Sequence, residues 1–243
     1  MNYTLYDASG NTFVIFHTDV EKDYSDLAVK LCSKENVDGL IVIVPHNKYD
    51  FKWLFYNNDG STASMCGNGT RAVAHYAYSN KLADKNLSFL TEAGVITCEI
   101  EGDIVETLMT NPKIIKQQFV EEGFTWWLLD TGVPHLVTFV DDLEQFDLEL
   151  SSSMRHKYNA NVNFANISDD TLYVRTFERG VENETMACGT GMTAAFVRGN
   201  LEGRLQNETV VYPKSKEKLT LRKDKEGSFF FKGQVKQGQT KEL

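Results

Sequence analysis

Hydrophobic and polar residues alternate along much of the chain, in the period typical of β-strands. In FKWLFYN (residues 51–57) the alternation places Phe51, Trp53 and Phe55 on one face. YVRTFER (residues 173–179) repeats the period. Further strand-like runs occupy residues 87–92, 95–102, 104–110, 126–130, 136–140, 208–212 and 218–235. In the last run an Asp-Lys-Glu-Gly centre predicts a hairpin turn, so the chain is expected to be rich in sheet.

Four segments follow a helical pattern instead. Residues 25–34 are amphipathic, as expected of a helix with one buried face, and a further helix is expected near residues 151–158. Residues 71–80 (RAVAHYAYSN) and 192–200 (MTAAFVRGN) are small or apolar on nearly every side. Such helices must be surrounded by protein, which together with the many strands predicts an α+β fold.

The strand and helix pattern repeats within the chain. Cys188 follows Cys66 by 122 residues, close to half of the 243. The same spacing relates three further pairs: Gly10 and Gly132, Gly39 and Asn161, and Phe55 and Phe177. Self-similarity at a fixed offset predicts two halves of similar fold. Residues 109–118 are the best candidate for the linker between them.

Composition and charge narrow the class of protein. The chain is 42% hydrophobic, contains no run of about 18 apolar residues and begins without the pattern of a signal peptide, which predicts a cytoplasmic location. The net charge of −9 disfavours nucleic acid or a membrane surface as a partner. The four cysteines lack metal-binding spacing, so no zinc site is expected. In a reducing compartment no disulfide framework is expected either.

Two of the four cysteines precede the predicted central helices. Cys32 and Cys98 fall in ordinary helix and strand patterns and are expected to be buried. Cys66 and Cys188 are instead each followed by Gly-x-Gly and a helix. Unpaired amides and the helix dipole at such a position favour a thiolate, and the same amides can bind a carboxylate.

The duplicated loop is compatible with several functions. Two matched acid/base groups suit inversion of a carbon centre, because one removes a proton from one face while the other donates to the opposite face. Each loop also fits the dinucleotide pattern G-x-G-x-x-A, as in a nicotinamide-dependent oxidoreductase, although a polar, turn-rich stretch precedes the first. A cysteine hydrolase would leave the second loop unused, and an amino-acid-binding protein would need neither thiol.

Five motifs resemble those of the diaminopimelate epimerase family: SGNTF, FYNNDGS, CGNGTR, TGVPH and ERGVENETMACGTG, in this order. The resemblance implies a cofactor-independent isomerase that interconverts LL- and meso-diaminopimelate, on the route to lysine and peptidoglycan. It also implies a homodimer and two pseudo-symmetric domains, each a mostly antiparallel β-sheet or barrel wrapped around a central helix. The expected domains are residues 1–112, completed by 229–243, and residues 113–228.

The resemblance assigns roles to matched positions. The expected acid/base pair is Cys66 and Cys188, with His135 and Glu178 tuning the thiols. The expected substrate-binding residues are Asn11, Asn57, Gly67, Asn68, Asn161, Glu178, Arg179, Gly189 and Thr190, and no metal is expected.

Three features depart from the commonest family pattern. Val133 stands where many members have asparagine, so one hydrogen bond to the distal part of the substrate is either missing or supplied elsewhere. Gly39 stands where some members have glutamine, and RGVENET is one residue longer than the frequent form. A proline or hydroxyproline racemase is the nearest rival within this mechanistic class. Asn68 and Arg179 disfavour it, because a forked cation such as Arg179 suits a second carboxylate that proline lacks.

Overall fold

The computed structural model describes residues 2–242 and divides the chain into two compact units. The described residues 2–107 and 233–242 belong to the first unit, and residues 108–232 form the second. The chain therefore leaves the first unit once and returns to it near its C-terminus. The boundaries lie a few residues from the expected 112 and 229.

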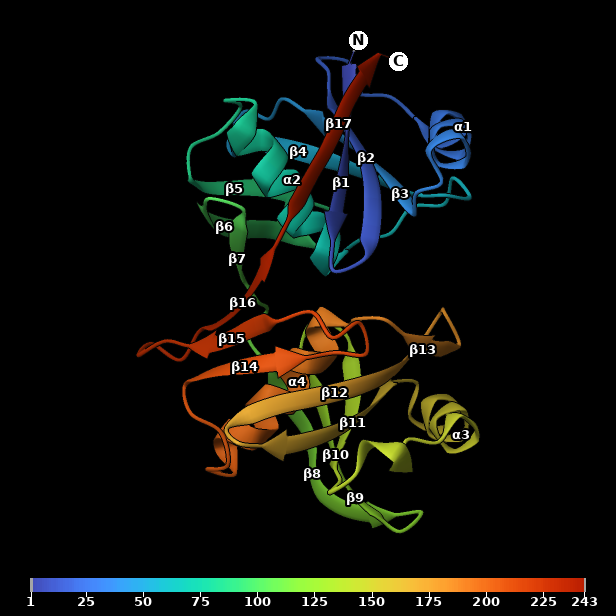
Figure 1. Ribbon diagram of the computed structural model, residues 1–243, viewed down its shortest axis with the longest axis vertical. Helices are drawn as coiled ribbons and strands as arrows, with labels where there is room; N and C mark the ends of the chain where they lie inside the picture. The colour runs from blue at the N-terminus through green and yellow to red at the C-terminus, as the bar shows by residue number, and fades with distance from the viewer. Residues whose placement is uncertain (1, 243) are drawn as a thin grey trace. The chain divides into compact units, whose positions relative to one another are not determined.

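Helices and strands alternate in the same manner in both units (Figure 1). The helices are α1 (Ser25–Glu35), α2 (Gly67–Ser79), α3 (Leu148–Tyr158), α4 (Gly189–Leu201) and the short 3-10 helix η1 (Leu143–Gln145). The strands that belong mainly to the first unit are β1 (Asn2–Ala8), β2 (Asn11–His17), β3 (Gly39–Val44), β4 (Phe51–Asn57), β5 (Asn86–Thr91), β6 (Gly94–Glu101), β7 (Ile104–Leu108) and β17 (Lys236–Glu242). Those of the second are β8 (Lys113–Glu121), β9 (Phe124–Asp130), β10 (Pro134–Phe139), β11 (Asn161–Ser168), β12 (Thr171–Glu178), β13 (Asn183–Thr185), β14 (Glu208–Tyr212), β15 (Leu219–Lys223) and β16 (Phe229–Gln234).

In the first unit the strands surround α2, drawn in teal in Figure 1. Aromatic and aliphatic side chains from β1 through β7 pack against the helix, among them Phe13, Trp53 and Phe89. The opposite face of β1 to β4 packs against α1 through a second cluster that includes Leu31 and Cys32. A helix enclosed in this way must be apolar all round, as the sequence of α2 is.

The second unit repeats this arrangement around α4. Strands β9 to β12 and β14 to β16 place apolar side chains such as Val137, Val174 and Leu221 against that helix. The other face of β9 to β12 packs against α3 through Phe164 and Met154. The predicted α+β fold with two similar halves, each a sheet around a central helix, is confirmed.

The order of strands shows how close the repeat is. The first unit has the order β17-β1-β2-β3-β4-β5-β6-β7. The second has β8-β9-β10-β11-β12-β14-β15-β16. Corresponding pairs of strands run in the same relative direction in both units. The pairs β2–β3 and β10–β11 are both parallel, and so are β4–β5 and β12–β14. Strand β17 thus occupies in the first unit the place that β8 occupies in the second. In the first unit the strand beside β1 is β17, which comes from the C-terminal end of the chain. In the second unit the strand beside β9 is β8, which directly precedes β9 in sequence.

The offset of 122 residues does not hold in every strand. It relates Gly39 to Asn161, which occupy the same position in β3 and β11. In the next strand, however, Leu40 pairs with Tyr56 while Val162 pairs with Phe177. Phe177 therefore corresponds to Tyr56, and its expected equivalence with Phe55 is wrong.

A shift of one residue in a strand turns each side chain to the opposite face. Phe55 accordingly packs on the side of α2, whereas Phe177 packs on the side of α3. Since Cys66 and Cys188 regain the offset of 122, the second unit has one residue more between this strand and its cysteine.

Two further expectations need correction. The proposed linker, residues 109–118, lies within the second unit: Met109 belongs to its core, and Lys113 begins β8. Its polar composition reflects the exposure of most of β8. Helix α3 begins at Leu148, three residues before the expected start, because Asp147 caps it by accepting a hydrogen bond from the Leu150 amide.

Candidate active site

Both candidate cysteines are the N-cap residues of the central helices. Cys66 precedes α2 and Cys188 precedes α4, and both have extended backbones. Their carbonyl groups accept the first helical hydrogen bonds, from Thr70 and Met192. Each thiol therefore stands beside the unpaired amides of a helix N-terminus, as expected. The two cysteines belong to different units.

Cys66 is half-buried and fixed by contacts within the first unit. Its Sγ accepts a hydrogen bond from the Gly69 amide at 3.3 Å and lies 3.6 Å from Asn11 Oδ1. Asn11 is held in turn, because its Nδ2 donates to Asp38. The thiol thus takes the role that a serine or aspartate oxygen plays at an ordinary N-cap.

The other predicted residues of the first unit lie in β4 and at the start of α2. Asn57 ends β4, and its side chain donates to the Ser61 hydroxyl. Gly67 and Asn68 form the first turn of α2. The Asn68 side-chain oxygen accepts a hydrogen bond from Arg71 at 2.7 Å.

In the second unit, Cys188 is linked to His135 through Thr190. The Thr190 hydroxyl lies 3.5 Å from Cys188 Sγ and 2.9 Å from His135 Nε2. His135 therefore does not contact the thiol directly. It sits on β10, and its Nδ1 faces Asn163 Nδ2 at 3.0 Å.

The contacts of Asn163 determine which nitrogen of His135 carries the proton. Asn163 Nδ2 faces the Leu136 carbonyl, which can only accept, and its Oδ1 accepts from the Thr176 hydroxyl. The amide orientation is thereby fixed, so Nδ2 must also donate to His135 Nδ1. Nε2 then carries the hydrogen and donates to Thr190 at 2.9 Å, so the longer 3.4 Å approach of Asn161 Nδ2 to Nε2 is not a hydrogen bond in this tautomer. The Thr190 hydroxyl is left to donate to Cys188.

Burial shifts the pKa values of both His135 and Cys188. His135 is fully buried, which lowers its pKa to about 3, and the positive charge of Arg179 acts in the same direction. Burial also raises the pKa of the Cys188 thiol to about 12, with a further contribution from the Glu178 carboxylate. The Thr190 hydroxyl and nearby amides oppose this only in part. The expected lowering of the thiol pKa by the helix N-terminus is thus wrong for Cys188, because desolvation is larger.

Three more predicted residues lie close together in the second unit. Glu178 ends β12, and burial raises the pKa of its carboxyl. Asn161 accepts a hydrogen bond from the Arg179 backbone amide at 2.7 Å. The Arg179 guanidinium donates to the Asn159 carbonyl. Asn161 thus orders the segment that carries Glu178 and Arg179.

A substitution of Gly191 should destabilise this unit. A Cβ added at Gly191 would lie 2.3 Å from Asn163 Oδ1, and Asn163 is held by three partners in the core. We expect Gly191→Ala to lower the free energy of unfolding by roughly 1–3 kcal/mol, measured by urea denaturation. Gly189→Ala is the matched control, because its added methyl group would meet only the Phe231 ring at 3.5 Å. Equal stability of the two variants would contradict the close approach of α4 and β11.

Sequence reasoning missed several residues that support the site, among them Asp38, Arg71, Asn163 and Thr176. All are polar side chains whose contacts reach residues distant in the sequence. Only Asn163 left a usable signal, since an asparagine two residues after Asn161 in a strand falls on the same face. The other three depend on tertiary neighbours.

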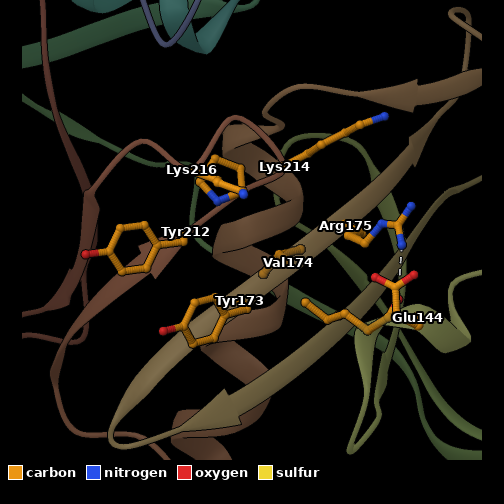
Figure 2. A pocket seen from close by; sticks show the side chains of 9 residues that line it. Glu144, Tyr173, Val174, Arg175, Tyr212, Lys214 and Lys216 are labelled. Carbon is orange, nitrogen blue, oxygen red and sulfur yellow. Dashed lines mark hydrogen bonds between the residues drawn. The ribbon is translucent and has the colours of Figure 1, made fainter.

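A pocket of about 610 Å³ lies elsewhere in the second unit (Figure 2). It is lined by Leu143, Glu144, Tyr173, Val174, Arg175, Tyr212, Pro213, Lys214 and Lys216. Tyr173 and Tyr212 stack with ring centroids 5.6 Å apart, and Arg175 forms a forked pair with Glu184. The pocket includes none of the predicted site residues.

Within residues 2–242, no helix is both long and apolar enough to cross a membrane. Within the same range, no group of three or more histidine, cysteine, aspartate or glutamate side chains is arranged to hold a metal ion.

Solved structures of similar fold come from several enzyme families. A PhzF-family phenazine biosynthesis protein from Enterococcus faecalis superimposes with a TM-score of 0.77 at 16% identity, covering 100% of this chain and 98% of that one. A hydroxyproline epimerase from Agrobacterium vitis has a TM-score of 0.68 at 13% identity, covering 100% and 90%. At such identities the likeness shows the fold alone.

Sequence comparison identifies the family. The model of the family described as diaminopimelate epimerase matches residues 3–115 and 127–241. The diaminopimelate epimerase of a Nitratiruptor species is 57% identical over 240 residues, covering 97% of this chain and 96% of that protein. The enzyme of the same name from Campylobacter lari is 50% identical with the same coverage. With both cysteine motifs at the N-termini of its two central helices, the chain belongs to the diaminopimelate epimerase family.

Proposed function

We propose that this protein interconverts LL- and meso-diaminopimelate without a cofactor, using Cys66 and Cys188 as the acid/base pair. The observation that carries the proposal is the duplicated helix N-terminus: in each unit a cysteine caps a buried helix of 13 residues. Family membership supports the substrate, because the relatives at 57% and 50% identity are named for it.

The reaction requires the thiols to act on opposite faces of one α-carbon. One thiolate removes the α-proton, and the other thiol donates a proton from the far side, so the configuration inverts. The reacting carboxylate would accept hydrogen bonds from the backbone amides at Gly67, Asn68, Gly189 and Thr190. Preorganised amides of this kind stabilise charge that develops in the transition state, and loss of one donor typically costs about 10²–10³ in rate.

The remaining predicted residues have roles that follow from their chemistry. Glu178, whose carboxyl is partly desolvated, would hold the reacting ammonium group, and His135 would orient the Thr190 hydroxyl toward Cys188. Asn11, Asn57 and Asn161 would hydrogen-bond the substrate. Arg179 would offer its planar cation to the distal carboxylate.

Exchange of the α-hydrogen with solvent deuterium tests the proposal. The purified protein, without added cofactor, should exchange and epimerise diaminopimelate, as followed by NMR. Proline and hydroxyproline serve as comparison substrates and should exchange far more slowly, because neither has a distal carboxylate for Arg179. Faster exchange of proline or hydroxyproline than of diaminopimelate would mean that diaminopimelate is not the substrate. No exchange of any of the three would refute the proposed reaction.

We also propose that the enzyme works in the cytoplasm as a homodimer, as the family resemblance implies. Light scattering of the purified protein tests the dimer, and a mass corresponding to a single chain would refute it.

A further inference from the structure

Arg71 is a fully buried cation near the Cys66 loop. It lies one turn into α2, and none of its surface is exposed. Its guanidinium donates to three groups from separate segments: the Asn68 side-chain oxygen, the Ser9 hydroxyl and the Gln234 carbonyl. Burial of a charged group is costly unless it is well hydrogen-bonded, and these bonds offset that cost while they tie three segments of the chain to α2.

Two of the partners lie next to groups that contact the thiol. Ser9 belongs to the turn between β1 and β2, and that turn leads to Asn11, whose Oδ1 faces Cys66 Sγ. Asn68 is adjacent to Gly69, whose amide donates to the same sulfur. Arg71 therefore connects the two segments that surround Cys66.

The corresponding position of the second unit carries no cation. The residue 122 positions later is Thr193, which is also buried but donates only to the Gly189 carbonyl one turn earlier. There the helix N-terminus is supported by His135 through Thr190 instead. The two thiols thus have different supports, even though their loops look alike in sequence.

We propose that Arg71 is the positioning residue of the Cys66 half of the site. It holds Asn68 and the turn that carries Asn11 in place around the thiol, and it acts through Asn68 rather than on the substrate itself. This inference rests on the proposed function for its kinetic consequences, while its effect on the reactivity of Cys66 does not depend on that function.

A double-mutant cycle with Asn68 tests the proposal. Arg71→Met keeps the length of the side chain and removes its donors, and we expect kcat/KM to fall roughly 10- to 100-fold. Asn68→Ala should cause a similar loss. If Arg71 acts through Asn68, the double variant should lose little more than the worse single variant, because coupled residues are not additive. Losses that multiply independently would overturn the proposal.

Alkylation provides a second readout without substrate. The rate of labelling by iodoacetamide at each cysteine is followed by mass spectrometry. In Arg71→Met this rate should change several-fold at Cys66 and stay unchanged at Cys188. Arg198→Met is the matched control, since Arg198 is also buried on a central helix and donates to the carbonyls of Thr125 and Val137. Arg198→Met should leave labelling of Cys66 unchanged.

The outcomes separate the two proposals. If wild-type protein does not exchange diaminopimelate, the proposed function fails, but selective change at Cys66 would still support the role of Arg71. Equal changes at both cysteines would show a general loss of stability and overturn that role. Should Arg71→Met not fold, Arg71→Lys replaces it: it keeps the charge but lacks the planar fork whose separate nitrogens reach the three acceptors. It should therefore show a smaller change at Cys66, and unaltered labelling would refute the proposal.

Discussion

Replacing either Cys66 or Cys188 by alanine should abolish epimerisation of diaminopimelate, lowering kcat/KM by roughly 10²–10⁴ or more. Inversion needs a base on one face of the α-carbon and an acid on the other, and each variant lacks one of the two. Methyl groups can neither accept nor donate a proton. The measurement is solvent deuterium exchange together with the conversion of LL- to meso-substrate. Undiminished activity in both variants would eliminate the two-thiol mechanism.

Cys32→Ala is the matched control for the loss of a thiol. Cys32 lies on α1 and is buried against the sheet of the first unit, and burial raises the pKa of its thiol to about 11. The variant should lose some stability through the small cavity it creates, but it should retain full activity. Inactivity of Cys32→Ala would mean that general loss of structure, rather than loss of chemistry, explains the other two variants.

His135 should make the protein markedly less stable in mild acid. Its pKa in the folded protein is about 3, compared with 6.5 for an exposed histidine. Below 6.5 the unfolded chain therefore binds a proton that the folded protein does not, so this contribution to stability is present above 6.5 and is lost as the pH falls toward 3. Between about pH 7.5 and pH 5 the expected loss from this one group is about 2 kcal/mol.

The comparison variant is His135→Gln, which keeps polar atoms in the buried position but does not titrate. Urea unfolding of both proteins at the two pH values isolates the contribution of His135, because His75, whose pKa is also lowered by burial, is present in both. The variant should lose less stability on acidification than the parent protein. The same loss in both would show that His135 is protonated in the folded state at pH 5.

The sequence alone was sufficient for the architecture and for the two thiols. Continuous apolar character in residues 71–80 and 192–200 required helices enclosed by protein, and α2 and α4 are enclosed. The repeated Cys-Gly-x-Gly, placed before each of these helices, required both thiols to stand at helix N-termini. These features are local in sequence, since periodicity and capping are decided within a few residues.

Tertiary structure decided what surrounds each thiol. The offset of 122 residues suggested two equivalent halves, but a shift of one residue in β12 turned Phe177 away from the face that Phe55 occupies. Pairing between strands settles such a shift, and the chain does not record it locally.

The electrostatics of the site also required the folded structure. The helix N-terminus predicted a lowered thiol pKa, yet burial raises the pKa of Cys188 to about 12. The His135–Thr190 link and the buried Arg71 join segments that lie far apart in the sequence. The candidate residues could therefore be proposed from sequence, while their protonation and their support depend on burial and on contacts that only folding brings together.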